Sequence, residues 1–309
     1  MKYLLVGGGG FIGSWLAREL KSKNHEVIII DPFVHYSDLE SKKIIKIISF
    51  RKKGLLKGVR IIKAKFQDIS KRIISDEKPD IVIHLAATPF ERDIDFPLSY
   101  KQITDDVSLT FQIVTALKPH PEIKLLYISS ISVYGDHEFA VTETAPYNPS
   151  TSYGISKASG EFLIKSSLEN WNIIRTTSVY GFGDINNRAI QNIFNKILEK
   201  KAFWINKDIW LDFIYVKDLV RGIEKVASKA KKTEIFHISG GKAYRLPEVV
   251  KIIKTHYKKL VFSVKKLDIP KRGSLVNSKA RVILGWSPKY SLKKGLRDYI
   301  LLINEYKVA

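Results

Sequence analysis

A tyrosine and a lysine four residues apart, Tyr153 and Lys157, are the side chains with the clearest potential for chemistry in this sequence. On a helix, residues i and i+4 lie on the same face, so the phenol and the ammonium would point into one site. A free tyrosine has a pKa of about 10, and a neighbouring lysine cation favours its phenolate. The pair could therefore take a proton from a substrate alcohol. The same spacing also arises by chance on ordinary helices.

A glycine-rich motif near the N-terminus could hold a phosphate group. Gly7-Gly8-Gly9-Gly10-Phe11-Ile12-Gly13 follows an apolar segment and precedes an amphipathic one. Glycines allow a tight turn and a close approach to a pyrophosphate, which amide groups at the start of a helix can bind. Asp31 ends the next apolar segment, and a carboxylate there accepts hydrogen bonds from both ribose hydroxyls of NAD while repelling the 2′-phosphate of NADP. The motif predicts a NAD site, and a glycine-rich turn that binds nothing is the alternative.

Serine residues form a third group with possible chemistry. Ser129, Ser130 and Ser132 lie at the end of an apolar run. At the carboxyl edge of a parallel sheet their hydroxyls would meet the substrate, although ordinary turn formation is the simpler interpretation. The absence of cysteine excludes disulfides and thiolate catalysis. No cluster has metal-ligand spacing, and we expect His84 to be a buried, hydrogen-bonded structural residue.

Strand and helix patterns alternate around these motifs. We expect strands at 2–6, 26–31, 59–63, 80–84, 124–129 and 172–176. Helical patterns cover 11–23, 98–117 and 152–168. This alternation predicts an α/β fold, a Rossmann-type doubly wound parallel sheet that binds ligands beyond the carboxyl ends of its strands.

The pattern becomes less regular after residue 177. We expect helices at 187–201, 218–229, 246–256 and 292–306, and a strand at 234–238. Residues 1–177 are predicted to form the NAD-binding domain. Residues 178–309 are predicted to form a smaller α/β lobe that mainly binds substrate, from which the chain can cross back to the first domain. The stretch 39–58, rich in lysine and isoleucine, is predicted to be a solvated helix and loop.

The net charge of +21 is unevenly distributed along the 309 residues. Residues 221–309 contain 22 lysines and arginines against 6 acidic residues, a net charge of +16. Such a segment attracts nucleotide diphosphates, nucleic acids or acidic membranes, and a solvated lysine-rich surface is an equal alternative. No apolar run reaches the roughly 18–20 residues of a membrane span, and the N-terminus does not resemble a signal peptide. We therefore expect a cytoplasmic protein.

Further segments agree with the motifs of one enzyme family along nearly the whole chain. They are Asp68, His84-Leu-Ala-Ala87, Pro149 before the tyrosine, Arg175-Thr-Thr-Ser-Val-Tyr-Gly181, Asp212-Phe-Ile-Tyr-Val-Lys-Asp218 and the stretch from Ser278 to Pro288. Together with the glycine motif, Ser130 and the tyrosine–lysine pair, they resemble the extended short-chain dehydrogenase/reductase family. This family contains the NAD-dependent epimerases and dehydratases of nucleotide sugars. The motifs are most similar to those of UDP-glucose 4-epimerase-like members.

The resemblance implies roles for individual residues. It makes Ser130, Tyr153 and Lys157 catalytic. It implies a NAD site formed by Gly7, Gly10, Phe11, Ile12, Gly13, Asp31, Asp68, Ile69, Leu85, Ala86 and Ala87, together with Tyr153 and Lys157. It implies that Ser132, Ser178 and Arg272 bind substrate. It further implies a nucleotide-diphosphate sugar as partner and a homodimer, with neither a membrane nor a nucleic acid as partner.

Four positions depart from the family pattern. Val6 replaces a common threonine, and Asp106 replaces a frequent active-site asparagine. Ser178 replaces a frequent asparagine, and Leu211 replaces an arginine that binds the substrate diphosphate. A leucine side chain has no group that can bind phosphate. These departures leave the substrate class more open than the fold or the cofactor.

The residues after Ser130 distinguish between activities within the family. The 4,6-dehydratases carry Asp-Glu at the two following positions, whereas this chain has Ile131 and Ser132, neither of which can act as a carboxyl acid or base. We therefore predict a nucleotide-sugar epimerase that passes through a keto intermediate, with C4 as the reacting carbon. The alternative, which Leu211 favours, is a NAD-dependent dehydrogenase or keto-reductase of a small alcohol or sugar, similar to the short-chain L-threonine dehydrogenases. A non-catalytic cofactor- or nucleic-acid-binding protein is a remote third hypothesis, against which the intact catalytic set argues.

Overall fold

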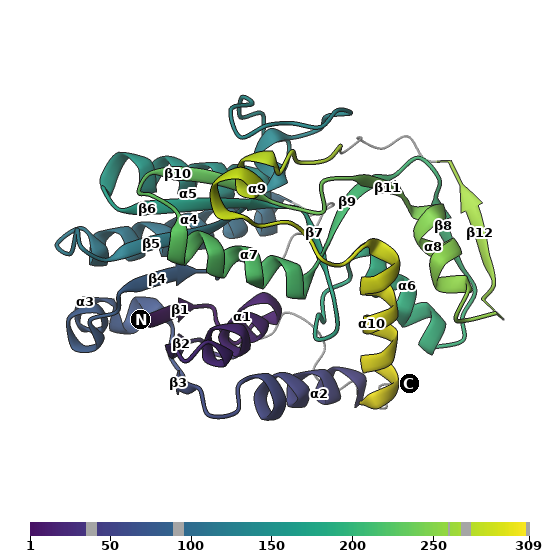
Figure 1. Cartoon of the computed structure of the whole chain (residues 1–309), viewed down its shortest axis with the longest axis horizontal. Helices are drawn as coiled ribbons and strands as arrows, with labels where there is room; N and C mark the ends of the chain where they lie inside the picture. The colour runs from purple at the N-terminus through teal and green to yellow at the C-terminus, as the bar shows by residue number, and fades with distance from the viewer. Residues whose placement is uncertain (35–41, 89–95, 259, 267–272, 307–309) are drawn as a thin grey trace.

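A seven-stranded, entirely parallel sheet forms the centre of the computed structural model (Figure 1), which describes residues 1–34, 42–88, 96–258, 260–266 and 273–306. The strand order is β3-β2-β1-β4-β5-β6-β10. The strands are β1 (Lys2–Val6), β2 (Glu26–Ile30), β3 (Arg60–Ile62), β4 (Ile81–His84), β5 (Lys124–Ser130), β6 (Trp171–Thr176) and β10 (Glu234–Ile238). The order reverses between β1 and β4, which is the point where doubly wound sheets bind their ligands.

The central strands are apolar because both faces of the sheet are covered. Tyr3 and Leu5 of β1 belong to one hydrophobic cluster, and Leu4 and Val6 belong to the other. Successive side chains along a strand point to opposite faces, so a run without polar residues fills two cores at once. The sequence pattern of these strands therefore predicts a buried parallel sheet, as observed.

Helices pack on both faces of the sheet. α1 (Phe11–Ser22) and α7 (Val216–Lys229) contact each other over one core. α3 (Phe66–Glu77), α4 (Phe96–Leu117) and α5 (Ser152–Ser167) form a contiguous layer over the other core. This two-sided arrangement is the predicted Rossmann-type fold.

The second half of the chain adds smaller sheets and helices at one end of the molecule (Figure 1). β7 (Ser178–Tyr180), β9 (Trp210–Tyr215) and β11 (Ala243–Arg245) form a three-stranded sheet. β8 (Phe203–Asn206) and β12 (Phe262–Lys265) pair separately. At the same end lie α6 (Ala189–Leu198), α8 (Leu246–Lys254) and α10 (Leu292–Glu305), whereas α9 (Ser278–Leu284) packs against β10 and α7. β10 belongs to the large sheet, in which it pairs with β6.

The predicted helices and strands agree with the structure to within a few residues, but α3, α9 and the strands of the two small sheets were not predicted, and the prediction for 39–58 is partly wrong. Residues 39–41 lie outside the described residues, and after them come α2 (Lys42–Ser49) and the π-helical segment η1 (Phe50–Leu55). Phe50 and Arg51 are buried rather than solvated. The Phe50 ring packs against the rings of Trp15 and Phe182, so this segment covers the outer side of α1. Its many lysines conceal that apolar contact in the sequence.

Candidate active site

The turn between β1 and α1 can accommodate a pyrophosphate. Gly7 has a φ of +83°, and a Cβ at this position would lie 2.6 Å from the backbone nitrogen of Ala86. Gly10 is the N-cap residue of α1 and has no side chain that could cap the first amide groups of that helix. Amide groups at the start of a helix and the positive end of the helix dipole favour an anion. The main chain of this turn therefore fits the diphosphate of a dinucleotide.

Asp31 lies directly beside this turn. Its carboxylate accepts hydrogen bonds from the amides of Gly9 (2.9 Å) and Phe33 (2.7 Å). Burial raises the pKa of Asp31, while these amides and the charges of Arg51 and Lys52 oppose the rise. The two amides fix the carboxylate next to the glycines, where the adenosine ribose of a dinucleotide would meet it.

The segment after β4 forms the other wall of the turn. The amides of Leu85 and Ala86 both donate to the Val6 carbonyl, at 2.9 and 3.0 Å. Gly7 is therefore held in close contact with this segment. Asp68 and Ile69 lie in the first turn of α3, beyond the end of β3, with Asp68 exposed and Ile69 half-buried.

Ser130 and Ser132 are held together where β5 ends. The Ser130 hydroxyl accepts from the Ser132 amide (3.1 Å) and donates to the Ser132 hydroxyl (3.2 Å). Ser130 thereby caps the 3₁₀ turn η2 (Ile131–Tyr134). Both side chains are buried at the carboxyl edge of the sheet.

Helix α5 brings Tyr153 and Lys157 to the same edge. The Thr151 hydroxyl caps this helix by accepting from the Gly154 amide at 3.1 Å. A Cβ at Gly154 would lie 2.5 Å from the Ser132 carbonyl oxygen, so the first turn of α5 is in close contact with η2. The Lys157 Nζ lies 5.7 Å from the centre of the Tyr153 ring. The three residues expected to be catalytic therefore surround the end of β5.

Lys157 is almost completely buried, and its environment perturbs its acidity. Its Nζ donates to the Ile128 carbonyl at 3.0 Å and lies 4.8 Å from the centre of the Tyr127 ring. Burial lowers the pKa of Lys157 to about 8, and the carboxylates of Asp106 and Glu161 oppose the shift. A lysine whose charge is this sensitive is typical of functional sites.

His84 is structural, as predicted. It is buried at the end of β4, and its Nε2 shares a 3.1 Å hydrogen bond with the Thr110 hydroxyl. Burial, aided by the charge of Lys157, holds the pKa of His84 well below its usual value. The imidazole is therefore neutral at physiological pH.

A buried ion pair behind the site was not foreseen from the sequence. Arg175 on β6 and Glu161 on α5 lie 2.7 Å apart, and both are essentially inaccessible to solvent. Glu161 also accepts from the hydroxyls of Ser129 (2.5 Å) and Tyr147 (2.7 Å). This network ties the last residues of β5 to α5. The available signal was a glutamate one helical turn after Lys157, on the same face of the helix.

Asp106, which the sequence marked as a departure from the family pattern, belongs to a polar stripe on α4 that was not predicted. Gln102, Asp106 and Thr110 follow one another at intervals of four residues, and all are buried. Gln102 accepts from the Ser152 hydroxyl at 2.7 Å, and Ser156 donates to Asp106 at 3.3 Å. The regular spacing of polar residues in a helix with an apolar core face was the signal for it.

The expected substrate residues are only partly brought together. Ser132 lies beside Ser130, whereas Ser178 is half-buried at the start of β7. Next to it, the Thr177 hydroxyl is buried and has no hydrogen-bond partner in the part of the chain that the structure describes. Leu211 packs against the core from β9, and Arg272 lies outside the described residues.

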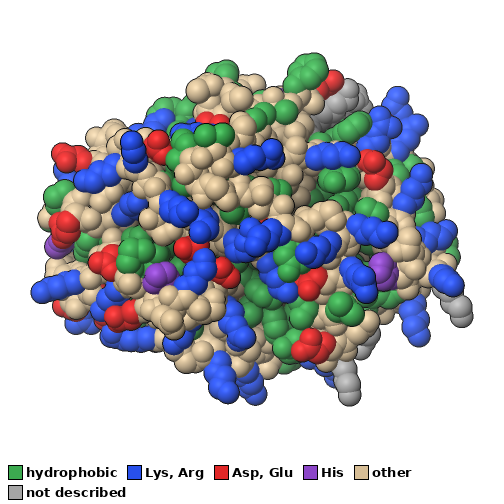
Figure 2. All heavy atoms as spheres, viewed as in Figure 1, with side chains coloured by type: hydrophobic (Ala, Val, Ile, Leu, Met, Phe, Trp, Pro, Cys, Tyr) green, Lys and Arg blue, Asp and Glu red, His purple; other side chains and the backbone are tan. Residues whose placement is uncertain are grey.

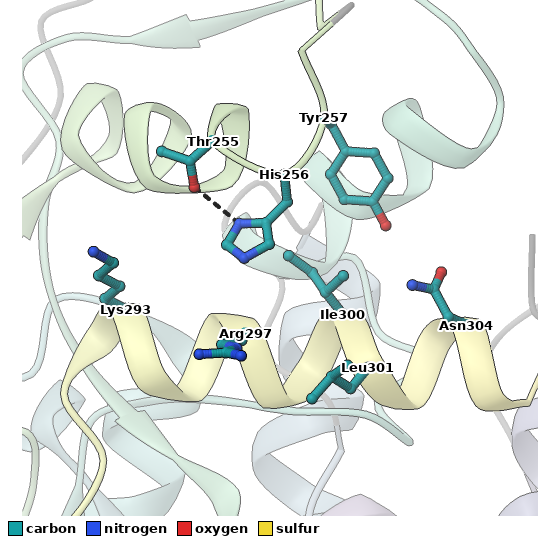
Figure 3. A pocket seen from close by; sticks show the side chains of 8 residues that line it. All are labelled: Thr255, His256, Tyr257, Lys293, Arg297, Ile300, Leu301 and Asn304. Atoms are coloured by element: carbon teal, nitrogen blue, oxygen red, sulfur yellow. Dashed lines mark hydrogen bonds between the residues drawn. The ribbon is translucent and has the colours of Figure 1, made fainter.

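A separate cavity of about 570 Å³ lies between the end of α8 and α10 (Figure 3). Its walls are Thr255, His256, Tyr257, Lys293, Arg297, Ile300, Leu301 and Asn304. None of these residues belongs to the glycine turn or to the cluster at the end of β5. In the described part of the chain, no helix is long and apolar enough to cross a membrane.

Comparison with known proteins decides the family. Residues 3–239 match the NAD dependent epimerase/dehydratase family. The chain belongs to this family. Members of the family are NAD-dependent enzymes, and the glycine turn and Asp31 of this member suit that cofactor.

Similar proteins extend over the whole chain. A Bacillus subtilis protein described as an uncharacterized UDP-glucose epimerase, YtcB, is 28% identical, with 98% of each chain aligned. A dTDP-glucose 4,6-dehydratase of Escherichia coli is 25% identical over 97% of this chain and 92% of its own. The crystal structure of UDP-glucuronic acid 4-epimerase from Bacillus cereus with NAD has a TM-score of 0.85 and 26% identity, covering 99% of this chain and 100% of that one. The similar proteins thus include both epimerases and dehydratases.

Proposed function

We propose that this enzyme is a nucleotide-sugar epimerase that inverts the sugar at C4 through a keto intermediate. The observation that carries the proposal is the meeting of Ser130, Tyr153 and Lys157 around the end of β5, at the same carboxyl edge of the sheet as the glycine turn. When bound there, NAD would accept a hydride from the sugar and return it. The chain's own residues must then manage the proton, the orientation of the sugar and the exclusion of water.

Tyr153 is the group that exchanges a proton with the sugar hydroxyl. The Lys157 cation favours the phenolate form, so that the phenol can act as a base near neutral pH. The Ser130 hydroxyl donates to the same substrate oxygen and orients it. In the structure this hydroxyl donates to the Ser132 hydroxyl, so it must turn from Ser132 to the substrate oxygen when substrate binds, while the Ser132 amide holds the Ser130 oxygen in place.

Epimerisation is favoured over dehydration by the residues of η2. Ile131 and Ser132 occupy the first two positions of this turn, and neither carries a carboxyl group that could protonate a leaving hydroxyl. The similarity to UDP-glucuronic acid 4-epimerase over the full length of both chains supports the same choice. The named dehydratases among the relatives make elimination the outcome to test against.

The substrate is proposed to be a nucleoside-diphosphate sugar bound by Ser132, Ser178 and Arg272, in a cytoplasmic enzyme. We also propose a homodimer that pairs α4 and α5 of two copies. Tyr100 and Phe111 on α4 and Phe162 on α5 are each more than half exposed, which leaves an apolar face on this helix layer. The domain boundary near residue 178 is proposed as the limit between the NAD-binding part and the mainly substrate-binding part.

The experiment is a substrate panel followed by proton NMR. The purified enzyme with NAD is incubated with UDP-glucose, UDP-glucuronic acid, dTDP-glucose or GDP-mannose. The proposal predicts that one of these sugars is converted to its C4 epimer with no net NADH. A 4-keto-6-deoxy product would establish a dehydratase instead.

A dehydrogenase of a small alcohol is the second candidate, and Leu211 favours it. With a leucine at this position, β9 lacks a group that binds diphosphate. Stoichiometric NADH formation from L-threonine or a free sugar, together with no conversion of any nucleotide sugar, would establish this activity.

A further inference from the structure

Asp106 is a buried carboxylate to which the proposed reaction gives no role. It lies near the catalytic edge, by which we mean the carboxyl end of β5 around which Ser130, Tyr153 and Lys157, the proposed catalytic residues, lie. Its side chain on α4 is 8% exposed. It accepts hydrogen bonds from the Thr88 amide (2.8 Å), the Thr88 hydroxyl (3.1 Å) and the Ser156 hydroxyl (3.3 Å). Thr88 directly follows the expected cofactor wall that ends at Ala87, and Ser156 directly precedes Lys157. One carboxylate therefore joins the cofactor wall to the catalytic helix.

The pairing of the buried charges around Asp106 indicates its electrostatic partner. Glu161 and Arg175 form a close ion pair with each other. Among the described residues, no lysine or arginine lies within ion-pair distance of Asp106, and Lys157 is the cation that interacts with it electrostatically. A buried ammonium without a nearby negative charge is costly, because burial removes its hydration. Since Arg175 occupies Glu161, Asp106 is the carboxylate left to balance Lys157.

The other groups around Lys157 provide little compensation. From β5 it meets the Ile128 carbonyl and the Tyr127 ring, and from its own helix it meets the Tyr153 ring. His84 on β4 is neutral, because burial lowers its pKa. The pKa of Lys157 is about 8 even with Asp106 opposing the effect of burial. The negative charge of Asp106 therefore favours the protonated form of Lys157.

We propose that Asp106 is a positioning residue whose negative charge keeps Lys157 protonated and whose hydrogen bonds hold the segment ending at Thr88 against α5. An asparagine at this position could make similar hydrogen bonds but would carry no charge. The carboxylate is thus the feature that matters for Lys157. The inference rests on the proposed function only in taking Lys157 as the group that supports Tyr153.

The direct test is the titration of Lys157, which needs no substrate. The ¹³Cε signal of Lys157 in lysine-labelled enzyme, assigned by its loss in Lys157→Arg, is followed against pH for the wild type and Asp106→Asn. Removal of the negative charge of Asp106 should move the midpoint to lower pH by about one unit. Asp105→Asn is the matched control, because Asp105 is the exposed neighbour on the same helix, and its midpoint should equal the wild-type value.

A second set of variants separates hydrogen bonding from charge. The double variant Thr88→Val with Ser156→Ala keeps the carboxylate of Asp106 and removes two hydroxyl donors. NAD binding should therefore weaken, while the titration midpoint of Lys157 should stay close to the wild-type value. In Asp106→Asn the opposite pattern is expected, with NAD binding retained and the midpoint lowered. A Lys157 midpoint that is the same in Asp106→Asn and the wild type would overturn the inference. If the midpoint falls but no nucleotide sugar is converted by the wild type, the proposed function fails while the role of Asp106 stands.

Discussion

The catalytic edge and the α8–α10 end of the molecule use charge in opposite ways. Around the end of β5, Lys157, Glu161 and Arg175 are all buried. Glu161 and Arg175 form an ion pair, and Lys157 donates a hydrogen bond to the Ile128 carbonyl. Around the cavity between α8 and α10, Lys293 and Arg297 are exposed. Figure 2 shows lysine and arginine side chains spread over this face of the molecule, many of them toward that end.

The difference shows that net charge is a poor guide to where the chemistry occurs. Residues 221–309 carry +16, yet none of their described lysines or arginines is buried. Exposed charges are screened by water and salt, whereas buried ones interact strongly and over short distances. The few buried charges around the end of β5 are therefore proposed to determine the reactivity, and the many exposed ones contribute a general attraction for anions.

The largest expected effect is the loss of the Tyr153 hydroxyl. Tyr153→Phe should lower turnover by about 10²–10⁴-fold, because a general acid/base is removed. NAD binding and the melting temperature should stay unchanged. Since Ser130 serves the same proton transfer, Tyr153→Phe with Ser130→Ala should cost much less than the product of the two single effects. Full turnover in Tyr153→Phe would mean that the ring only packs on α5.

The next largest effect is a difference in the free energy of unfolding when one arginine is replaced in each region. Arg175→Met should destabilise the fold by about 3–5 kcal/mol, because Glu161 is left buried without its partner. Arg297→Met, at the exposed cavity, should change stability by no more than about 0.5 kcal/mol. Urea unfolding measures both values. Equal effects would remove the distinction between the two regions.

Histidines provide the same comparison through pH. Burial lowers the pKa of His237 to about 3, and its Nε2 shares a 2.7 Å hydrogen bond with the Tyr134 hydroxyl. His237 takes up a proton less readily in the folded state than in the unfolded chain. The stability that the neutral His237 contributes is therefore fully present above about pH 6.5 and is lost as the pH falls toward 3. His237→Asn should therefore reduce the loss of melting temperature between pH 7 and pH 4. Replacement of the exposed His256 by asparagine is the control, and the loss of melting temperature between pH 7 and pH 4 should then equal that of the wild type.

The smallest effect expected is on cofactor choice. Asp31→Asn should weaken NAD binding by roughly tenfold, about 1.4 kcal/mol, and narrow its advantage over NADP. The exposed Asp76→Asn on α3 is the control, and its affinities should match the wild type. Fluorescence titration with both cofactors provides the measurement. Tighter binding of NADP than of NAD by the wild type would contradict the role given to Asp31.

Local patterns were sufficient to predict most of the sheet. β1 and β2 are continuous apolar runs, ended by Gly7 and Asp31, and such runs bounded by glycine or a polar residue identify buried strands. The glycine turn and the Tyr153–Lys157 pair were visible for the same reason, because the residues that act together are neighbours in the sequence. The segment 50–55 was misjudged because its buried contacts are with α1 and with residues near 182.

The supporting shell of the site could not be predicted in this way. Asp106 contacts residues 18 and 50 positions away, and Glu161 pairs with a residue 14 positions away on another element. Only the folded sheet brings such residues together, so the spacing along α4 and α5 can mark them as buried polar positions but does not identify their partners. The substrate side is less defined still, because Arg272 lies outside the described residues.

The central claim is that the catalytic edge removes a hydride from C4 and returns it to the same carbon. The most direct measurement uses a nucleotide sugar deuterated at C4, chosen from the substrate panel, with unlabelled NAD and enzyme. We expect that the C4 epimer forms with its deuterium retained at C4 and that no reduced cofactor accumulates. Loss of the deuterium to solvent, or its stoichiometric transfer to a reduced cofactor that is released, would contradict it.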